Sequence, residues 1–265
     1  MKFKSLISTA CILLATIAAP GMAKAEYPNK PVRIIISFPP GGASDSLARA
    51  VGKELSEMWG QPVIPENRGG ANGVIAAQLL SKAAPDGYTL GLVAIGHAIN
   101  PLLYKNIPYD TDQDFTPVSL IATYPLAVLV PKGSAATDIK SFISAARSSD
   151  KAMTYGSGGN GSSQHLAGAL FTRMAGLEML HIPYRGGAQA LMDTAAGTVD
   201  SIITLPPLPM IKEGTVRALA VTSADRVSWL PDVPTLAEQG IVGYESVAWY
   251  GLMAPKGIPP LSSTL

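Results

Sequence analysis

Cysteine is nearly absent from this sequence, and aromatic residues are scarce. The one cysteine among 265 residues, Cys11, lies in an apolar segment near the N-terminus, and aromatic residues make up 6% of the chain. Beyond that segment, disulfide bonds, cysteine-bound zinc and thiol nucleophiles are excluded. A cage of stacked aromatic rings is also disfavoured, although Tyr155, Tyr184 and Trp249 remain candidates to border a binding site.

A large excess of either charge is lacking as well. The chain has 20 basic and 19 acidic residues, and removing residues 1–25, which contain Lys2, Lys4 and Lys24, would leave 17 basic residues. Such a balance argues against nucleic acid or a strongly anionic membrane surface as a partner. Any attraction for an anion must therefore be local.

The N-terminus has the parts of a secretory signal peptide. Lys2 and Lys4 precede a mainly apolar run over residues 6–19, and Ala23-Lys24-Ala25 supplies an A-x-A cleavage site. We expect cleavage after Ala25 and export of the rest of the chain. No later segment stays apolar for the roughly 20 residues that a membrane-spanning helix needs.

Strands and helices alternate along the exported part. The β-branched run Val32–Ser37 predicts a buried strand, and apolar residues at helical spacing over Leu47–Met58 predict a helix that Gly60 ends. Repetition of this order predicts an α/β fold with two lobes. The expected division is residues 26–125 for the first lobe, 126–225 for the second, and 226–265 for a return to the first.

Four glycine-rich turns each connect a predicted strand to a predicted helix and carry almost no catalytic side chains. In chain order, the glycine turns are residues 38–45, 68–73, 155–163 and 184–188. A helix N-terminus presents unpaired N–H groups, and glycines let a ligand approach them closely. Strand ends of this kind lie at one edge of a sheet, where α/β proteins bind ligands. The sequence therefore predicts a site for a small anion, with Arg68 and Arg185 as candidate bidentate partners.

Other chemistries fit the residues less well. Gly156–Gly161 satisfies G-x-G-x-x-G, but the next strand ends without the acidic residue of a dinucleotide site. Ser163 and His165 are close in sequence but lack a G-x-S-x-G elbow, so we expect them to cap a helix, with an esterase as the enzymatic alternative. The three histidines lack metal-ligand spacing, and neither a metal nor a cofactor is predicted.

Five motifs then occur in one order along the chain. They are Tyr27-Pro28-x-Lys30-Pro31-Val32-Arg33-Ile34-Ile35, Pro39-Pro40-Gly41-Gly42-x-x-Asp45, Glu66-Asn67-Arg68-x-Gly70-Ala71-x-Gly73, Ala84-Pro85-Asp86-Gly87-Tyr88-Thr89-Leu90 and Ile182-Pro183-Tyr184-Arg185-Gly186. Together they resemble the tripartite tricarboxylate transporter substrate-binding proteins, the TctC or Bug family. The resemblance covers residues 26–260.

This resemblance implies a periplasmic, monomeric, two-lobed binding protein of the type II fold, with a mixed sheet flanked by helices in each lobe. It implies that the first and third glycine turns face each other across a cleft and grip a carboxylate, which a permease of the tripartite type then receives. A ligand sensor that docks onto a signalling receptor is the alternative. The candidate ligand-binding residues are Pro40, Gly41, Gly42, Asp45, His97, Ser157, Gly158, Asn160, Ser162, Ser163, His165, Tyr184, Arg185 and Gly186.

The sequence departs from the resemblance at its C-terminus. Family members usually continue past a Pro-Pro pair with helices that finish the first lobe, whereas this sequence stops at Leu265, five residues after Pro260. We expect a shortened first lobe with exposed apolar surface and reduced stability.

Overall fold

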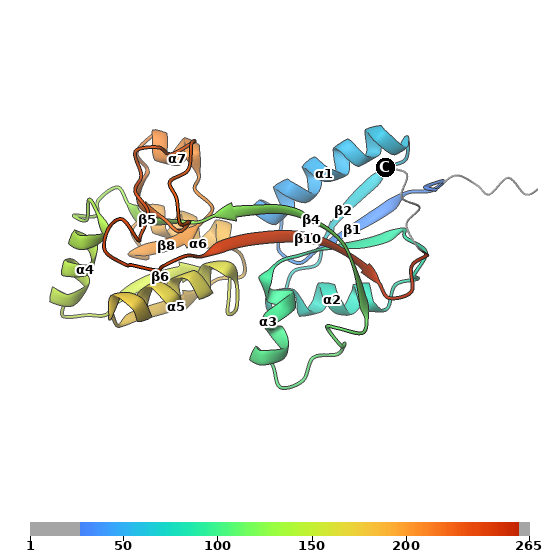
Figure 1. Cartoon of the computed structure of the whole chain (residues 1–265), viewed down its shortest axis with the longest axis horizontal. Helices are drawn as coiled ribbons and strands as arrows, with labels where there is room; N and C mark the ends of the chain where they lie inside the picture. Colours follow the sequence, from blue (N-terminus) through green and yellow to red (C-terminus); the bar gives the residue numbers. More distant parts are fainter. Residues whose placement is uncertain (1–26, 260–265) are drawn as a thin grey trace, which may run out of the picture.

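The computed structural model describes residues 27–259, which form two lobes with one five-stranded sheet each (Figure 1). The predicted two-lobed α/β fold with a mixed sheet in each lobe is confirmed. The predicted signal peptide, its cleavage site and residues 260–265 lie outside the described residues. Within residues 27–259, no helix is long and apolar enough to cross a membrane.

The sheet of the first lobe has the strand order β2-β1-β3-β10-β4. β1 runs parallel to β2 and β3, whereas β10 runs antiparallel to β3 and β4. The strands are β1 (Val32–Ile36), β2 (Val63–Asn67), β3 (Thr89–Val93), β4 (Phe115–Pro125) and β10 (Val247–Pro255). The helices are α1 (Ala43–Trp59), η1 (Ala71–Gly73), α2 (Val74–Ser81) and α3 (Ile95–Leu103).

The second sheet has the order β7-β6-β8-β5-β9. β6 is parallel to β7 and β8, and β5 is antiparallel to β8 and β9. The strands are β5 (Ala127–Pro131), β6 (Met153–Ser157), β7 (Met179–Pro183), β8 (Ser201–Thr204) and β9 (Val216–Val221). The helices are α4 (Ile139–Ser148), α5 (Ser163–Ala175), α6 (Gly187–Ala195) and α7 (Leu208–Lys212).

Both faces of β1 are buried, which explains why its sequence is a continuous apolar run instead of an alternating one. Ile34 and Ile36 pack in a cluster with Ala48 of α1, while Ile35 packs on the other face with Leu80 of α2. The central strands are thereby held between helices. Their carboxyl ends, which carry the loops, are left to face the other lobe.

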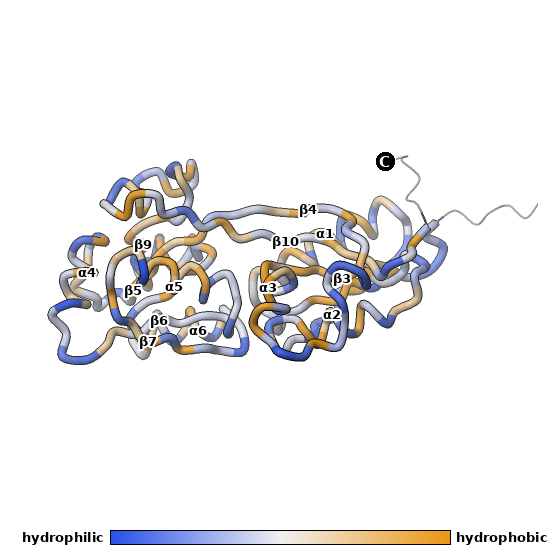
Figure 2. Tube along the Cα trace, turned by 60° about the horizontal axis from the view of Figure 1, so that its bottom comes forward, coloured by the Kyte–Doolittle hydropathy of each residue, from blue (hydrophilic) through white to orange (hydrophobic). Residues whose placement is uncertain are grey.

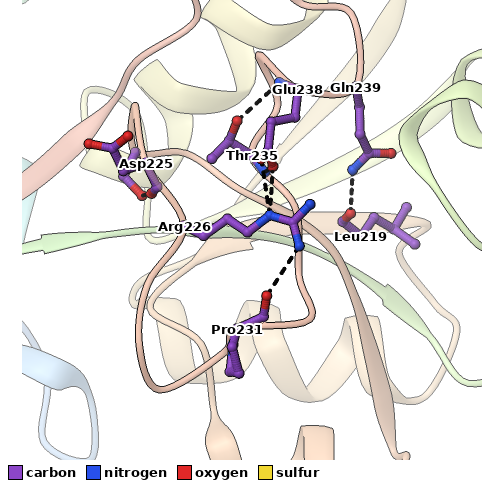
Figure 3. A network of polar contacts seen from close by, with 8 residues as sticks. Leu219, Asp225, Arg226, Pro231, Thr235, Glu238 and Gln239 are labelled. Carbon is purple, nitrogen blue, oxygen red and sulfur yellow. Dashed lines mark hydrogen bonds and ion pairs between the residues drawn. The ribbon is translucent and has the colours of Figure 1, made fainter.

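Residues 226–246, which the sequence placed in the returning segment, pack against the second sheet. Leu236, Ile241 and Tyr244 belong to the buried cluster that contains Phe142 and Phe171 of that lobe. A polar network also fastens the segment, as Figure 3 shows. The network joins Arg226 to Glu238 at 2.9 Å, Glu238 to the N–H of Thr235 at 2.7 Å, and Gln239 to the carbonyl of Leu219 at 2.6 Å.

Two segments connect the lobes, one between β4 and β5 and one between β9 and β10. β4 and β10 pair along their length and run together between the lobes (Figure 1). In the other view, α3 of the first lobe lies next to loops of the second (Figure 2). The two lobes therefore touch at their loop ends and are joined by the crossing strands.

Candidate functional site

The four glycine turns all follow carboxyl ends of parallel strands. The first and second follow β1 and β2, and the third and fourth follow β6 and β7. In both sheets the chain then continues on the opposite side of the first strand, at β3 and β8 respectively. Each lobe therefore has a topological switch point, at β1/β3 and β6/β8, where loops diverge and α/β proteins bind ligands.

Contacts between the lobes bring these turns together. A methyl group added at Gly186 would lie 3.5 Å from Cδ of Pro39, so the fourth turn meets the first. One added at Gly161 would collide with Leu103 of α3 and lie 2.7 Å from Nδ2 of Asn72, so the third turn meets the second turn and α3. The resemblance had placed the first turn opposite the third, whereas these contacts pair the first with the fourth.

A small cavity lies at the switch point of the first lobe. Its volume is about 10 Å³, which is roughly the space that one water molecule needs. The hydroxyl of Ser37, at the cavity wall, donates to the carbonyl of Leu92 at 3.0 Å and so joins β1 to β3. Other residues of the wall are Phe38, Asn72, Ala94, Gly96 and His97.

His97 is the predicted site residue that this cavity contains. Its side chain is 6% exposed and lies edge-on to Phe115, with ring centroids 4.7 Å apart. Burial lowers the pKa of His97, so the imidazole is neutral at neutral pH. Neither ring nitrogen has a hydrogen-bond partner among the described residues, and the same holds for Oδ1 of Asn72. The cavity wall can therefore both donate and accept hydrogen bonds.

Asp45 braces the first glycine turn. Its carboxylate accepts hydrogen bonds from the N–H of Gly41 at 3.0 Å, from Nε of Arg49 at 3.1 Å and from Nδ2 of Asn67 at 3.0 Å. The hydrogen bond from Arg49 holds the pKa of this carboxyl below its usual range. The N–H of Gly41 is thereby paired within the protein. By contrast, Gly42, the N-cap of α1, supplies no side-chain cap for that helix.

The N–H groups of the third glycine turn are also paired within the protein. Those of Gly158, Gly159 and Gly161 donate to Oε1 of Gln164, Oγ of Ser157 and Nδ1 of His165, at 2.6, 3.1 and 3.0 Å. The predicted capping role of Ser162 is borne out, because its hydroxyl accepts from the N–H of His165 at 3.2 Å. The turn is therefore a rigid, internally hydrogen-bonded structure.

The fourth glycine turn is more open. The hydroxyl of Tyr184 donates to Asp193 at 2.8 Å, and burial raises the pKa of Tyr184 to about 12. Arg185 is exposed, as is Asn160 of the third turn. Gly186 is the N-cap of α6 and supplies no side-chain cap, so the first N–H groups of α6 resemble those of α1.

Two side chains at the site were missed by the sequence reasoning. Gln164 joins the third turn to β8, because its Nε2 donates to the hydroxyl of Thr204 at 2.7 Å. Asn72 lies at the contact with the third turn and donates through Nδ2 to Asn100 at 3.0 Å. Their positions beside glycines were the available signal. No cluster of residues that could hold a metal ion occurs among residues 27–259.

Comparison with known proteins gives consistent matches. The family model described as "Tripartite tricarboxylate transporter family receptor" matches residues 47–262. A UPF0065 protein encoded between tcbD and tcbE in Pseudomonas sp. (strain P51) is 42% identical, covering 88% of this chain and 70% of the relative. BugT of Bordetella pertussis is 36% identical, covering 98% and 81%.

Solved structures give the same result. An R. palustris protein with adipate is 40% identical, with a TM-score of 0.86 over 88% of this chain and 79% of that one. MatC from Rhodopseudomonas palustris with bound malate is 34% identical, with a TM-score of 0.81 over 88% and 80%. The periplasmic binding protein BugD is 34% identical, with a TM-score of 0.83 over 88% and 79%.

Proposed function

The chain belongs to the tripartite tricarboxylate transporter receptor family, as its motifs predicted, and we propose that it captures a small carboxylate between its lobes. The family consists of solute-binding proteins, and two of the similar solved structures hold adipate and malate. A linear acid with one or two carboxylates is therefore the ligand class that we propose for this chain.

The observation that carries the proposal is the meeting of four glycine turns from two switch points. α1 and α6 begin at the first and fourth turns, which touch through Pro39 and Gly186, and both helices lack side-chain caps. Uncapped N-termini attract a carboxylate through free N–H groups and the helix dipole. Three or four such charge-assisted bonds, at ~1.5–3 kcal/mol each, are enough for micromolar binding, which needs ~8 kcal/mol.

The candidate residues divide into two proposed roles. Asp45, Ser157, Gly158, His165 and Tyr184 already bond to other protein groups, so we assign them to shaping the turns. The remaining candidates are assigned to the ligand surface, where an exposed Arg185 can pair bidentately with a carboxylate. They are Pro40, Gly41, Gly42, His97, Asn160, Ser162, Ser163, Arg185 and Gly186.

We assign binding and no catalysis to the site. Nδ1 of His165 accepts from Gly161, so it is not directed at Ser163 as an esterase would require. The serine–histidine contact that does occur, Ser157 to His181 at 2.6 Å, involves a fully buried serine. We further propose that the chain acts as a monomer in the periplasm and hands its ligand to a permease of the tripartite type.

Thermal unfolding of the purified chain tests the proposal. A ligand that binds only the folded state at about 100 times its Kd stabilises by ~2.7 kcal/mol. For a protein of this size we expect the midpoint to rise by roughly 5–10 °C with adipate, malate or a related acid. The neutral diamide of each acid is the matched control. A cooperative transition that no carboxylate shifts would contradict the proposal.

A further inference from the structure

Two histidines are stacked beneath the third glycine turn. The rings of His165, from α5, and His181, from β7, have centroids 4.0 Å apart and an interplanar angle of 18°. Tyr155 of β6 covers the other face of His181 at 4.9 Å. The sequence reasoning had treated His181 as a packed core residue, so the direct contact between the two imidazoles is new information from the fold.

Both histidines hold the turn by hydrogen bonds. Nδ1 of His165 accepts from the N–H of Gly161 at 3.0 Å. Nε2 of His181 contacts Oγ of Ser157 at 2.6 Å, and the same hydroxyl accepts from the N–H of Gly159 at 3.1 Å. Alternate residues of the turn are therefore tied to one imidazole or the other.

The hydrogen bond from Gly161 requires one protonation state. An imidazole nitrogen accepts only when it carries no proton, so His165 is neutral here with its proton on Nε2. Protonation of Nδ1 would turn an acceptor into a donor that faces another N–H. A positive charge on both rings would also place like charges face to face at 4.0 Å.

The surroundings of the pair offer no compensating charge. The groups that face it are Tyr155 and Ser157 of β6 and Gly161 of the turn. No Asp, Glu, Lys or Arg among residues 27–259 forms an ion pair with either ring. Burial lowers the pKa of both histidines, and that of His181, which His165 lowers further, falls to about 4.

The turn that these histidines hold is the one that meets the first lobe. Gly161 lies against Asn72, Ile99 and Leu103, so a change in its backbone would alter how the lobes close. We propose that His165 and His181 are positioning residues that keep the third glycine turn competent for ligand only while both rings are neutral. Ligand affinity then falls as the surroundings acidify. This inference rests on the proposed carboxylate-binding function.

Histidine nitrogen and Gly161 amide NMR shifts of the unliganded chain test the structural half of the inference. Over about pH 4–8 we expect Nδ1 of His165 to be unprotonated at neutral pH and both rings to titrate below the usual value of ~6.5. The Gly161 amide shift should follow the His165 titration. A His165 that titrates at the usual value, or a Gly161 amide that ignores it, would overturn the inference. This measurement needs no ligand, so it stands apart from any failure of the proposed function.

Calorimetric titration with adipate tests the functional half. His165→Asn leaves an amide oxygen that can accept from Gly161 but cannot titrate, and His181→Gln does the same opposite Ser157. For the wild type we expect affinity to fall about tenfold per pH unit below the pKa of His165. His165→Asn should bind at neutral pH with a flatter pH profile. Protonation of adipate itself affects both proteins equally, so identical profiles would overturn the inference. If adipate binds neither protein at neutral pH, the proposed ligand class fails instead.

Discussion

The hydroxyl of Thr222 donates a hydrogen bond to the backbone carbonyl of Ser246 at 2.6 Å, and the N–H of Ser246 returns one to the carbonyl of Thr222 at 2.9 Å. The same hydroxyl accepts from the N–H of Leu126 at 2.8 Å. Leu126 and Ser246 belong to the two segments that connect the lobes. One fully buried side chain thus ties both crossings together at the base of the hinge.

Replacing Thr222 with Val should destabilise the protein without changing its shape. The variant keeps the side-chain volume but leaves a buried N–H of Leu126 and a carbonyl of Ser246 short of a partner, which costs ~1–3 kcal/mol. The midpoint of thermal unfolding should fall by roughly 2–10 °C. Thr222→Ser keeps the hydroxyl and is the matched control. Equal midpoints for the two variants would argue against the hinge role of the hydroxyl.

Replacing Asp45 with Asn should weaken the brace of the first turn. The amide cannot accept from Gly41, Arg49 and Asn67 together, so we expect a loss of ~1–3 kcal/mol at neutral pH. Because the folded-state pKa of Asp45 is depressed, its contribution is complete well above pH ~4 and is lost as the pH falls through the folded value. Unfolding midpoints of variant and wild type should therefore converge in acid. Glu57→Gln, on an exposed turn of α1, should stay within ~0.5 kcal/mol of wild type.

Adding a methyl group at Gly161 should prop the lobes apart. The backbone of Gly161 has φ +78°, and its Cβ would collide with Leu103 and Asn72 of the first lobe. Gly197 also has φ +78° but would meet nothing within 4 Å, so Gly197→Ala controls for backbone strain. We expect Gly161→Ala to weaken carboxylate binding by at least ~1.4 kcal/mol, a factor of ten, and to raise the radius of gyration in small-angle scattering. Equal affinities for the two variants would mean that the lobes do not close on Gly161.

Replacing Gln164 with Glu should oppose anion binding. Gln164 bridges Gly158 and Thr204 at the switch point of the second lobe, and a carboxylate there would repel the ligand. At an effective dielectric constant of 20 and a separation of ~8 Å, the repulsion is ~2 kcal/mol. Gln113→Glu places the same charge on an exposed loop and should leave affinity unchanged. Calorimetric titration with adipate or malate compares the two, and a Gln164→Glu protein that binds as well as Gln113→Glu would contradict this prediction.

Much of the architecture could be predicted because it depends on neighbours in sequence. The run at Val32–Ser37 became β1, Gly60 ends α1 in the left-handed conformation, and Ser162 caps α5. Local reasoning also made errors. It expected Ser44 or Asp45 to cap α1, whereas the N-cap is Gly42 and Asp45 bonds back to Gly41. It also missed α3, because Pro101 lies inside that helix.

The sequence by itself determined the alternation of strands and helices, the positions of the glycine turns and the family. These features follow from periodicity, turn chemistry and motif order, all of which act over short stretches of chain. Only the tertiary structure decided which turns meet, which N–H groups stay open and that His165 stacks on His181. Hydrogen-bond pairing and burial depend on groups brought together from distant positions, and a residue's neighbours in sequence do not specify its partners in space.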